Sequence, residues 1–114
     1  MEGEILKGHL DMIVLAVLAA GPAHGYAVME EIRQRSKQAF DLPEGTIYPV
    51  LHRLEQAGFL SSRWVTAESG RQRRVYALTR RGARAFAGQQ ALWQKFAAAM
   101  GGLLAGARPR RRPA

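Results

Sequence analysis

Residues 43–58 form a stretch whose polar side chains have the types and spacing to bind phosphates. At about 100° per residue, a helix over this stretch has an apolar stripe made of Ile47, Val50, Leu51 and Leu54. Its opposite face carries Gly45, Pro49, His52, Arg53 and Gln56, with Tyr48 on the flank. Gly45 lets a partner approach the backbone, and the unpaired N–H groups at a helix start suit an anion. The pattern predicts a recognition helix, although ordinary amphipathic surface helices share it.

The segment after this helix is rich in arginine and predicts a β-hairpin. Gly58 suits the left-handed end of a helix, and two runs of strand-forming residues, 59–66 and 73–79, flank a turn at 67–72. From residue 63 to residue 84 the only acid is Glu68, against seven arginines: Arg63, Arg71, Arg73, Arg74, Arg80, Arg81 and Arg84. This density of positive charge indicates a partner that carries phosphates.

Further helices must hold this helix and hairpin in place. Residues 8–20 are apolar on nearly every side, which predicts a helix that a second subunit helps to cover. Residues 23–38 have the pattern of a supporting helix, and Thr79 is a good N-cap for a last helix over 80–105. The predicted fold class is mainly α with a small antiparallel β-hairpin, a winged helix-turn-helix with a C-terminal dimerisation helix.

The last predicted helix carries an unusually wide apolar surface for a helix that ends a fold. Phe86, Trp93, Ala97, Met100 and Leu104 recur at near-heptad spacing, and an adjoining stripe contains Leu92, Phe96 and Leu103. We therefore predict a homodimer in which this helix packs on its own copy, with the apolar helix 8–20 nearby. The predicted interface consists of Met12, Leu15, Phe86, Trp93, Ala97, Met100 and Leu104.

The predicted organisation has three parts. A winged-helix DNA-binding domain covers residues 1–79, the dimerisation helix covers 80–105, and a disordered basic tail covers 106–114. The 114 residues suffice for one folded domain, and the net charge is +8. Half of that charge lies in the tail, which contains Arg108, Arg110, Arg111 and Arg112.

The composition excludes several kinds of site. The chain has no cysteine, which excludes disulfides and thiolate metal sites and fits a reducing cytoplasm, where we expect the protein. The longest apolar run, Met12 to Ala20, is shorter than the about 20 residues of a membrane span, so no membrane partner is expected. His9, His24 and His52 have no cluster of carboxylates beside them, so we predict no metal and no cofactor. No catalytic motif can be placed, and the protein is not predicted to be an enzyme.

Six short motifs follow one another along the chain. They are Leu6-Lys-Gly8, His24-Gly25-Tyr26, Glu44 to Leu54, Gly58-Phe59-Leu60, Gly70 to Tyr76 and Leu78 to Gly82. In this order and spacing they resemble the PadR family of bacterial transcriptional regulators, over about residues 6–86. The short C-terminal region is similar to that of the small subgroup, which has a single dimerisation helix.

The resemblance implies a winged-helix homodimer that binds double-stranded DNA at an inverted repeat, usually as a repressor released by a small molecule. At the start of the recognition helix, it implies DNA-facing positions for Gly45, Thr46, Tyr48, Pro49 and His52. It also implies DNA contacts in the wing, from Arg71, Arg73 and Arg74, and near the backbone, from His24 and Tyr26. By their length and polarity, Arg53 and Gln56 join His52 as side chains able to reach base edges.

Trp93 and Phe96 have two interpretations. Large aromatic side chains dominate interface energetics, so Trp93 fits plain dimer packing. Alternatively, Trp93, its symmetry mate and Phe96 line a gap at the two-fold axis that stacks a small aromatic effector, which the resemblance allows.

A rival function stays open for the fold as a whole. A winged helix can use its basic face to bind an acidic protein partner, since fold does not dictate function. An RNA-binding module is disfavoured, because the sequence offers no paired aromatic residues on a sheet surface to stack bases.

Overall fold

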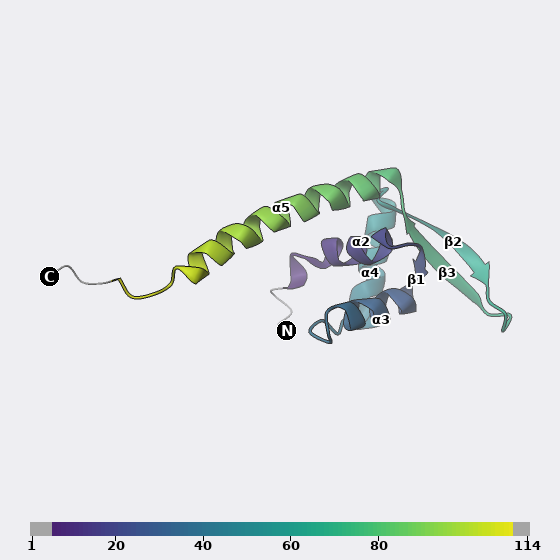
Figure 1. The fold of residues 1–114 in the computed structure, drawn as a ribbon. Coiled ribbons are helices and arrows are strands. Elements are labelled where there is room, and N and C mark those ends of the chain that lie inside the picture. Colours follow the sequence, from purple (N-terminus) through teal and green to yellow (C-terminus); the bar gives the residue numbers. More distant parts are fainter. Residues whose placement is uncertain (1–5, 111–114) are drawn as a thin grey trace.

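The chain folds into a helical body from which one long helix extends (Figure 1). A computed structural model describes residues 6–110. Within these residues, the elements follow in the order α2 (Leu10–Ala19), β1 (Ala23–His24), α3 (Gly25–Arg35), α4 (Glu44–Gln56), β2 (Leu60–Thr66), β3 (Gln72–Leu78) and α5 (Arg80–Ala105). The predicted winged helix-turn-helix with a C-terminal helix is confirmed.

The strands of residues 6–110 form one antiparallel sheet in the order β1–β3–β2. β2 and β3 are the predicted hairpin, called the wing below, and Gly70 in its turn has a φ of 84°, which favours glycine. β1 was not predicted. Its residues Ala23 and His24 pair with β3, although the sequence predicted that a helix starts at residue 23. Two residues are too few to show the alternation by which a strand is recognised.

α2 lies at the centre of the body. Four of its side chains, Val14, Leu15, Val17 and Leu18, are buried, because α3, α4, α5 and β3 all contact this helix. The help of a second subunit that the sequence predicted is not needed for these four residues, because the domain itself buries them. Leu15 is 1% exposed in a single chain, so it has no surface to offer a second copy and leaves the predicted dimer interface.

α4 has the two faces that the sequence predicts. The apolar stripe is buried in the core, and Gly45, Pro49, His52, Arg53 and Gln56 on the opposite face are exposed. Pro43 is the N-cap, with extended backbone, and Gly58 follows the helix with a φ of 85°. The polar face of α4 is thus free of cover from the described residues.

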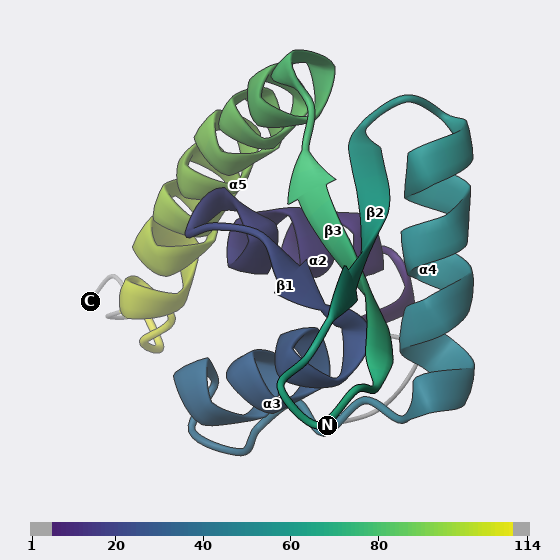
Figure 2. The ribbon, with the colours of Figure 1, turned by 90° about the vertical axis from the view of Figure 1, so that its right-hand side faces the viewer.

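The start of α3, the exposed face of α4 and the wing border one groove, and the turn of the wing projects away from the body (Figure 1). In Figure 2, α5 and α4 lie on opposite sides of the sheet. The surface formed by α3, α4 and the wing is therefore separate from the surface of α5.

α5 begins as predicted and then leaves the body (Figure 1). The Thr79 hydroxyl accepts a hydrogen bond from the Gly82 N–H at 3.0 Å, which caps the first turn. The early turns of α5 contact α2 and β3, whereas every residue from 90 to 110 is exposed. The part of the basic tail beyond residue 110, with Arg111 and Arg112, lies outside the described residues.

Candidate nucleic-acid interface

A groove of about 650 Å³ lies between the start of α3, the exposed face of α4 and the wing. Seven side chains singled out from the sequence line it, namely His24, Tyr26, Tyr48, His52, Arg71, Arg73 and Arg74. They come from three separate stretches of the chain, and the fold brings them to one surface. We call this surface the interface groove.

The start of α4 presents little bulk beside this groove. A methyl group added at Gly45 would meet nothing within 4 Å, so the backbone there is open to a partner. Pro49, His52 and Gln56 continue the same exposed face along the helix, and Thr46 is half-buried at its edge. Glu44 also lines the groove and is its one acidic side chain.

The Tyr48 ring fits against the neighbouring helix because residue 25 is a glycine. Gly25 is buried at the first position of α3, and a Cβ there would lie 2.7 Å from the Tyr48 hydroxyl. Tyr48 and His52, one turn apart on α4, have ring centroids 6.4 Å apart. The absence of a side chain at residue 25 therefore lets the Tyr48 ring lie across the start of α3.

His24 connects α3 with the wing. Its Nδ1 accepts the Ala27 N–H at 3.3 Å and so caps α3, while Arg73 Nη1 lies 3.0 Å from its Nε2. The neutral ring has one donor and one acceptor nitrogen, so its tautomer decides whether Nδ1 accepts the Ala27 N–H or Nε2 accepts the Arg73 N–H. Partial burial and the Arg73 charge lower the pKa of His24.

Arg74 differs from the other wing arginines because its guanidinium forms an ion pair with an acidic residue of the same chain. Its Nε donates to the Ser62 hydroxyl at 2.8 Å, and its Nη2 donates to Glu55 on α4 at 3.0 Å. The guanidinium also lies over the ring of Trp64, its partner across the strands, at 5.9 Å from the centroid. Arg71 and Arg73 are exposed, whereas Arg74 ties the wing to the recognition helix.

Arg53, on the other flank of α4, is paired with α2. Its Nη2 and Nη1 donate to the two carboxylate oxygens of Asp11 at 2.7 and 3.0 Å. The hydrogen bonds with Asp11 raise the pKa of Arg53. Opposite flanks of α4 are thus tied by charged pairs to different elements, Arg53 to α2 and Glu55 to the wing.

No sequence pattern predicted a role in the site for Asp11, Glu55, Ser62 or Trp64. The first three are single polar residues whose partners lie on other elements, so no local pattern reveals them. The predicted turn at 67–72 would place Trp64 opposite Val75, whereas β3 begins one residue earlier, at Gln72, and Trp64 pairs with Arg74.

A second groove, of about 380 Å³, separates the start of α2 from α5. It brings together the two aromatic residues predicted for an effector: the ring centroids of Trp93 and Phe96 are 5.7 Å apart. His9 packs edge-on against Trp93 at 5.4 Å, and Asp11 and Met12 complete the wall on the α2 side. We call this the α2–α5 groove.

The residues predicted for a dimer interface divide into two groups. Phe86 packs against the core of its own chain, and Met12 is half-buried. Trp93, Ala97, Met100 and Leu104 are exposed on the part of α5 that leaves the body. The adjoining stripe is exposed as well, with Leu92 at 71% and Leu103 at 72%, so it widens the apolar surface.

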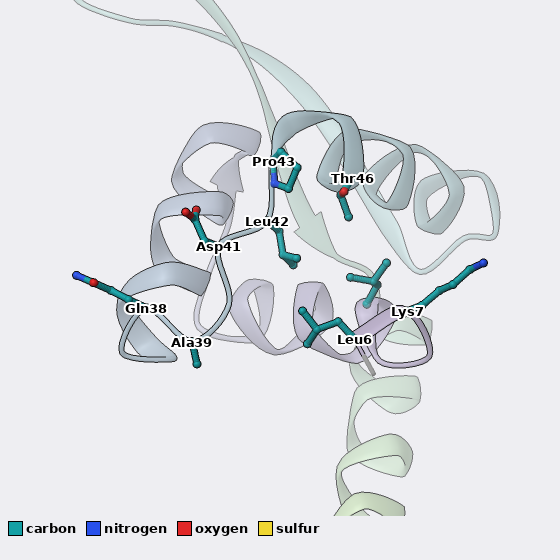
Figure 3. A pocket seen from close by; sticks show the side chains of 9 residues that line it. Leu6, Lys7, Gln38, Ala39, Asp41, Leu42, Pro43 and Thr46 are labelled. Atoms are coloured by element: carbon teal, nitrogen blue, oxygen red, sulfur yellow. The ribbon is translucent and has the colours of Figure 1, made fainter. Parts of the chain in front are cut away.

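A further cavity, of about 480 Å³, lies at the start of α4 (Figure 3). Pro43 and Thr46 line it from α4, Leu6 and Lys7 from the segment before α2, and Asp41 from the α3–α4 connection. Its walls carry charges of both signs, which gives no preference for an anion over a cation. Within residues 6–110, no cluster of His, Cys, Asp or Glu could hold a metal ion.

No helix in the described part of the chain is long and apolar enough to cross a bilayer.

Comparison with known proteins identifies the family of this arrangement. The profile of the "Transcriptional regulator PadR-like family" matches residues 14–88. The transcriptional regulator Rv3488 of Mycobacterium tuberculosis is 34% identical over 76 residues, which are 67% of this chain and 67% of that protein.

Solved structures agree with this match. A PadR family regulator from Eggerthella lenta is 33% identical, with a TM-score of 0.73 over 89% of this chain and 86% of that chain. A PadR-like regulator from Bacillus cereus has a TM-score of 0.81 over 91% of this chain and 99% of that one; at 22% identity it shows the fold alone. The chain belongs to the PadR-like family of transcriptional regulators, which are DNA-binding proteins and not enzymes.

Proposed function

We propose that the protein is a ligand-responsive repressor that binds an inverted-repeat operator in the cytoplasm as a homodimer. The observation that carries this proposal is the interface groove, which gathers the exposed face of α4, the start of α3 and the wing arginines on one surface. The exposed face of α4 suits the major groove of a duplex, and the positive charge of the wing suits the flanking phosphates.

The contacts sort into two kinds. Thr46, Tyr48 and the amides at the start of α4 are suited to phosphates, and so are His24, Tyr26, Arg71 and Arg73, because phosphate contacts fix the position of a protein on DNA. The side chains suited to base edges lie farther along the exposed face of α4 and are His52, Arg53 and Gln56. Arg74 supports the wing instead of contacting the duplex.

The exposed apolar surface of α5 supports the dimer. PadR-like regulators generally bind DNA as dimers, and Trp93, Met100 and Leu104 offer a surface of the kind that two copies bury. Two recognition helices about 34 Å apart would read successive major grooves of a near-palindromic site.

Selection of a bound duplex from a random library, followed by salt titration, tests the proposal. If each subunit neutralises about three phosphates, affinity falls about a thousandfold between about 50 and about 200 mM salt. The selected sequence should be an inverted repeat. A salt dependence near zero, or no enrichment of any sequence, would contradict DNA recognition by this surface.

The effector is proposed to be a small flat aromatic molecule that stacks on Trp93 and Phe96. The two rings lie side by side on the wall of the α2–α5 groove, which supports the idea. Planar compounds should quench the fluorescence of Trp93 in a Trp64→Phe background, because Trp64 is 64% exposed and would otherwise contribute. If Trp93→Ala leaves binding of such compounds unchanged, Trp93 serves dimer packing alone.

A further inference from the structure

The ion pair between Asp11 and Arg53 joins the core of the domain to its reading surface. Asp11 lies in the first turn of α2, and Arg53 in the last turn of α4. The pair is bidentate, with Nη2 to Oδ1 at 2.7 Å and Nη1 to Oδ2 at 3.0 Å. The Arg53 side chain is nevertheless 58% exposed, so it is held without being covered.

The way in which Asp11 holds Arg53 leaves part of the guanidinium unused. A guanidinium has five N–H donors in a planar fork, and the carboxylate takes one from each terminal nitrogen. The edge formed by Nε–H and the second N–H of Nη2 still points away from Asp11. Two parallel donors on one edge match the O6 and N7 acceptors of a guanine in the major groove.

The position of Asp11 makes it a firm support. The helix that carries it is the central one of the body, anchored by the buried side chains of Val14 and Leu15. Its place near the start of α2 also favours a carboxylate, because the N-terminal end of a helix is positive. An exposed arginine without such a partner would sample many rotamers before each encounter with DNA.

A purely structural role explains this pair less well. Ion pairs between exposed side chains contribute little to folding stability, and both members here are more than one-third exposed. Asp11 can fix the orientation of the Arg53 guanidinium on the exposed face of α4 even though neither side chain is buried.

We propose that Asp11 is a positioning residue for Arg53, and that Arg53, held in this way, reads a guanine in each operator half-site. This inference rests on the proposed function, since it concerns how the same surface selects its sequence. It adds a specificity-determining pair, one member of which lies on α2, outside the recognition helix.

The test uses the full chain and the duplex that the wild-type chain selects from a random library. Affinities for this duplex, for versions with each G·C pair replaced in turn by A·T, and for random duplex are compared among wild type, Asp11→Asn, Arg53→Gln and the double variant. Glu30→Gln is the matched control, because it breaks an exposed Glu30–Arg33 pair on α3 and makes the same change of charge.

Asp11→Asn is expected to lower the preference for the selected duplex over random duplex about tenfold, with the loss confined to one G·C pair per half-site. Affinity for random duplex should not fall, because the variant gains positive charge. In the Arg53→Gln background, Asp11→Asn should change the preference no further, which a general loss of structure would not produce. Circular dichroism and the melting temperature should stay near those of wild type.

The inference alone is overturned if Asp11→Asn keeps the wild-type preference, lowers it as Glu30→Gln does, or adds its effect to that of Arg53→Gln. A loss spread evenly over all base pairs also overturns it. Failure of the wild-type chain to prefer any duplex removes the proposed function, and the inference with it.

Discussion

Arg74 on β3 donates a hydrogen bond to Glu55 on α4 at 3.0 Å, and this ion pair ties the wing to the recognition helix. Ser62 on β2 bonds both residues, so three elements meet at one point. The angle between wing and recognition helix therefore depends on a polar cluster that touches neither base nor phosphate in our proposal.

Substitution of Glu55 in this cluster should affect DNA affinity in two opposite ways, through the geometry of the wing and through charge. Glu55→Gln removes a negative charge, which alone would strengthen DNA binding, yet it weakens the hold on the wing. We expect affinity for the selected duplex to fall about tenfold, because a freer wing must be ordered on binding. Glu68→Gln, on the turn of the hairpin, makes the same charge change and should bind slightly more tightly. Fluorescence anisotropy measures both; a gain of affinity in Glu55→Gln would contradict the role of the cluster.

Salt titration separates the wing arginines. Arg71→Ala and Arg73→Ala should each lower the magnitude of the salt slope by about one per subunit, since each removes a phosphate contact. Arg74→Ala should lose affinity with a smaller change of slope, because its charge is paired with Glu55. Equal slopes for Arg73→Ala and Arg74→Ala would show that both contact phosphates.

Substitution of Gly45 should raise the stability of the fold and lower its affinity for DNA. A methyl group at this position meets nothing in the free chain, so Gly45→Ala should raise the free energy of unfolding by about 0.5 kcal/mol. The same methyl would stand between helix and duplex, and affinity should fall at least about tenfold. Urea denaturation and anisotropy are the two measurements. Unchanged affinity would mean that the start of α4 does not approach the DNA closely.

Gly82 fixes the direction in which α5 leaves the body. A Cβ there would overlap the carbonyl oxygen of Phe59, which already accepts the Thr79 N–H at 3.1 Å. Gly82→Ala should therefore lower the free energy of unfolding by about 3 kcal/mol. Gly88→Ala, on the same helix with nothing within 4 Å, should raise it by about 1 kcal/mol. A neutral Gly82→Ala would mean that the junction moves easily.

His24 should make stability depend on pH. Burial and the Arg73 charge place its folded pKa below the ordinary value of 6.5. The unfolded chain then binds more protons in acid, so stability is complete above about pH 6.5 and falls as the pH drops through the folded pKa. His24→Asn keeps an acceptor at the N-cap and should lose less stability between about pH 7.5 and about pH 5.5. An equal drop of the urea midpoint in both chains between these two pH values would contradict this role.

The sequence predicted what local pattern controls. The period of α4 separated Ile47 and Leu51 from Gly45 and His52, and the cap at Thr79 marked the start of α5, because these features depend on residues close in sequence. The resemblance brought the arginines of the wing and His24 together, and the interface groove has them on one surface.

The rest depends on tertiary packing, which no local pattern contains. Leu15 reads equally well as core or as dimer interface, since an apolar side chain does not reveal which neighbour covers it. Arg53 and Arg74 read as free positive charges, and their partners Asp11 and Glu55 are known only when α2 and the wing are placed beside α4.

α5 carries its apolar stripes beyond the domain, and much of their surface is not covered by other parts of residues 6–110. A lone copy thus holds Leu92, Leu103 and Leu104 in water, and pairing removes that cost. The melting temperature should accordingly rise with protein concentration, as it does whenever assembly and folding are linked. In a cell, newly made chains would be vulnerable to proteases until they meet a second copy, so the quantity of regulator would itself depend on how fast subunits find each other.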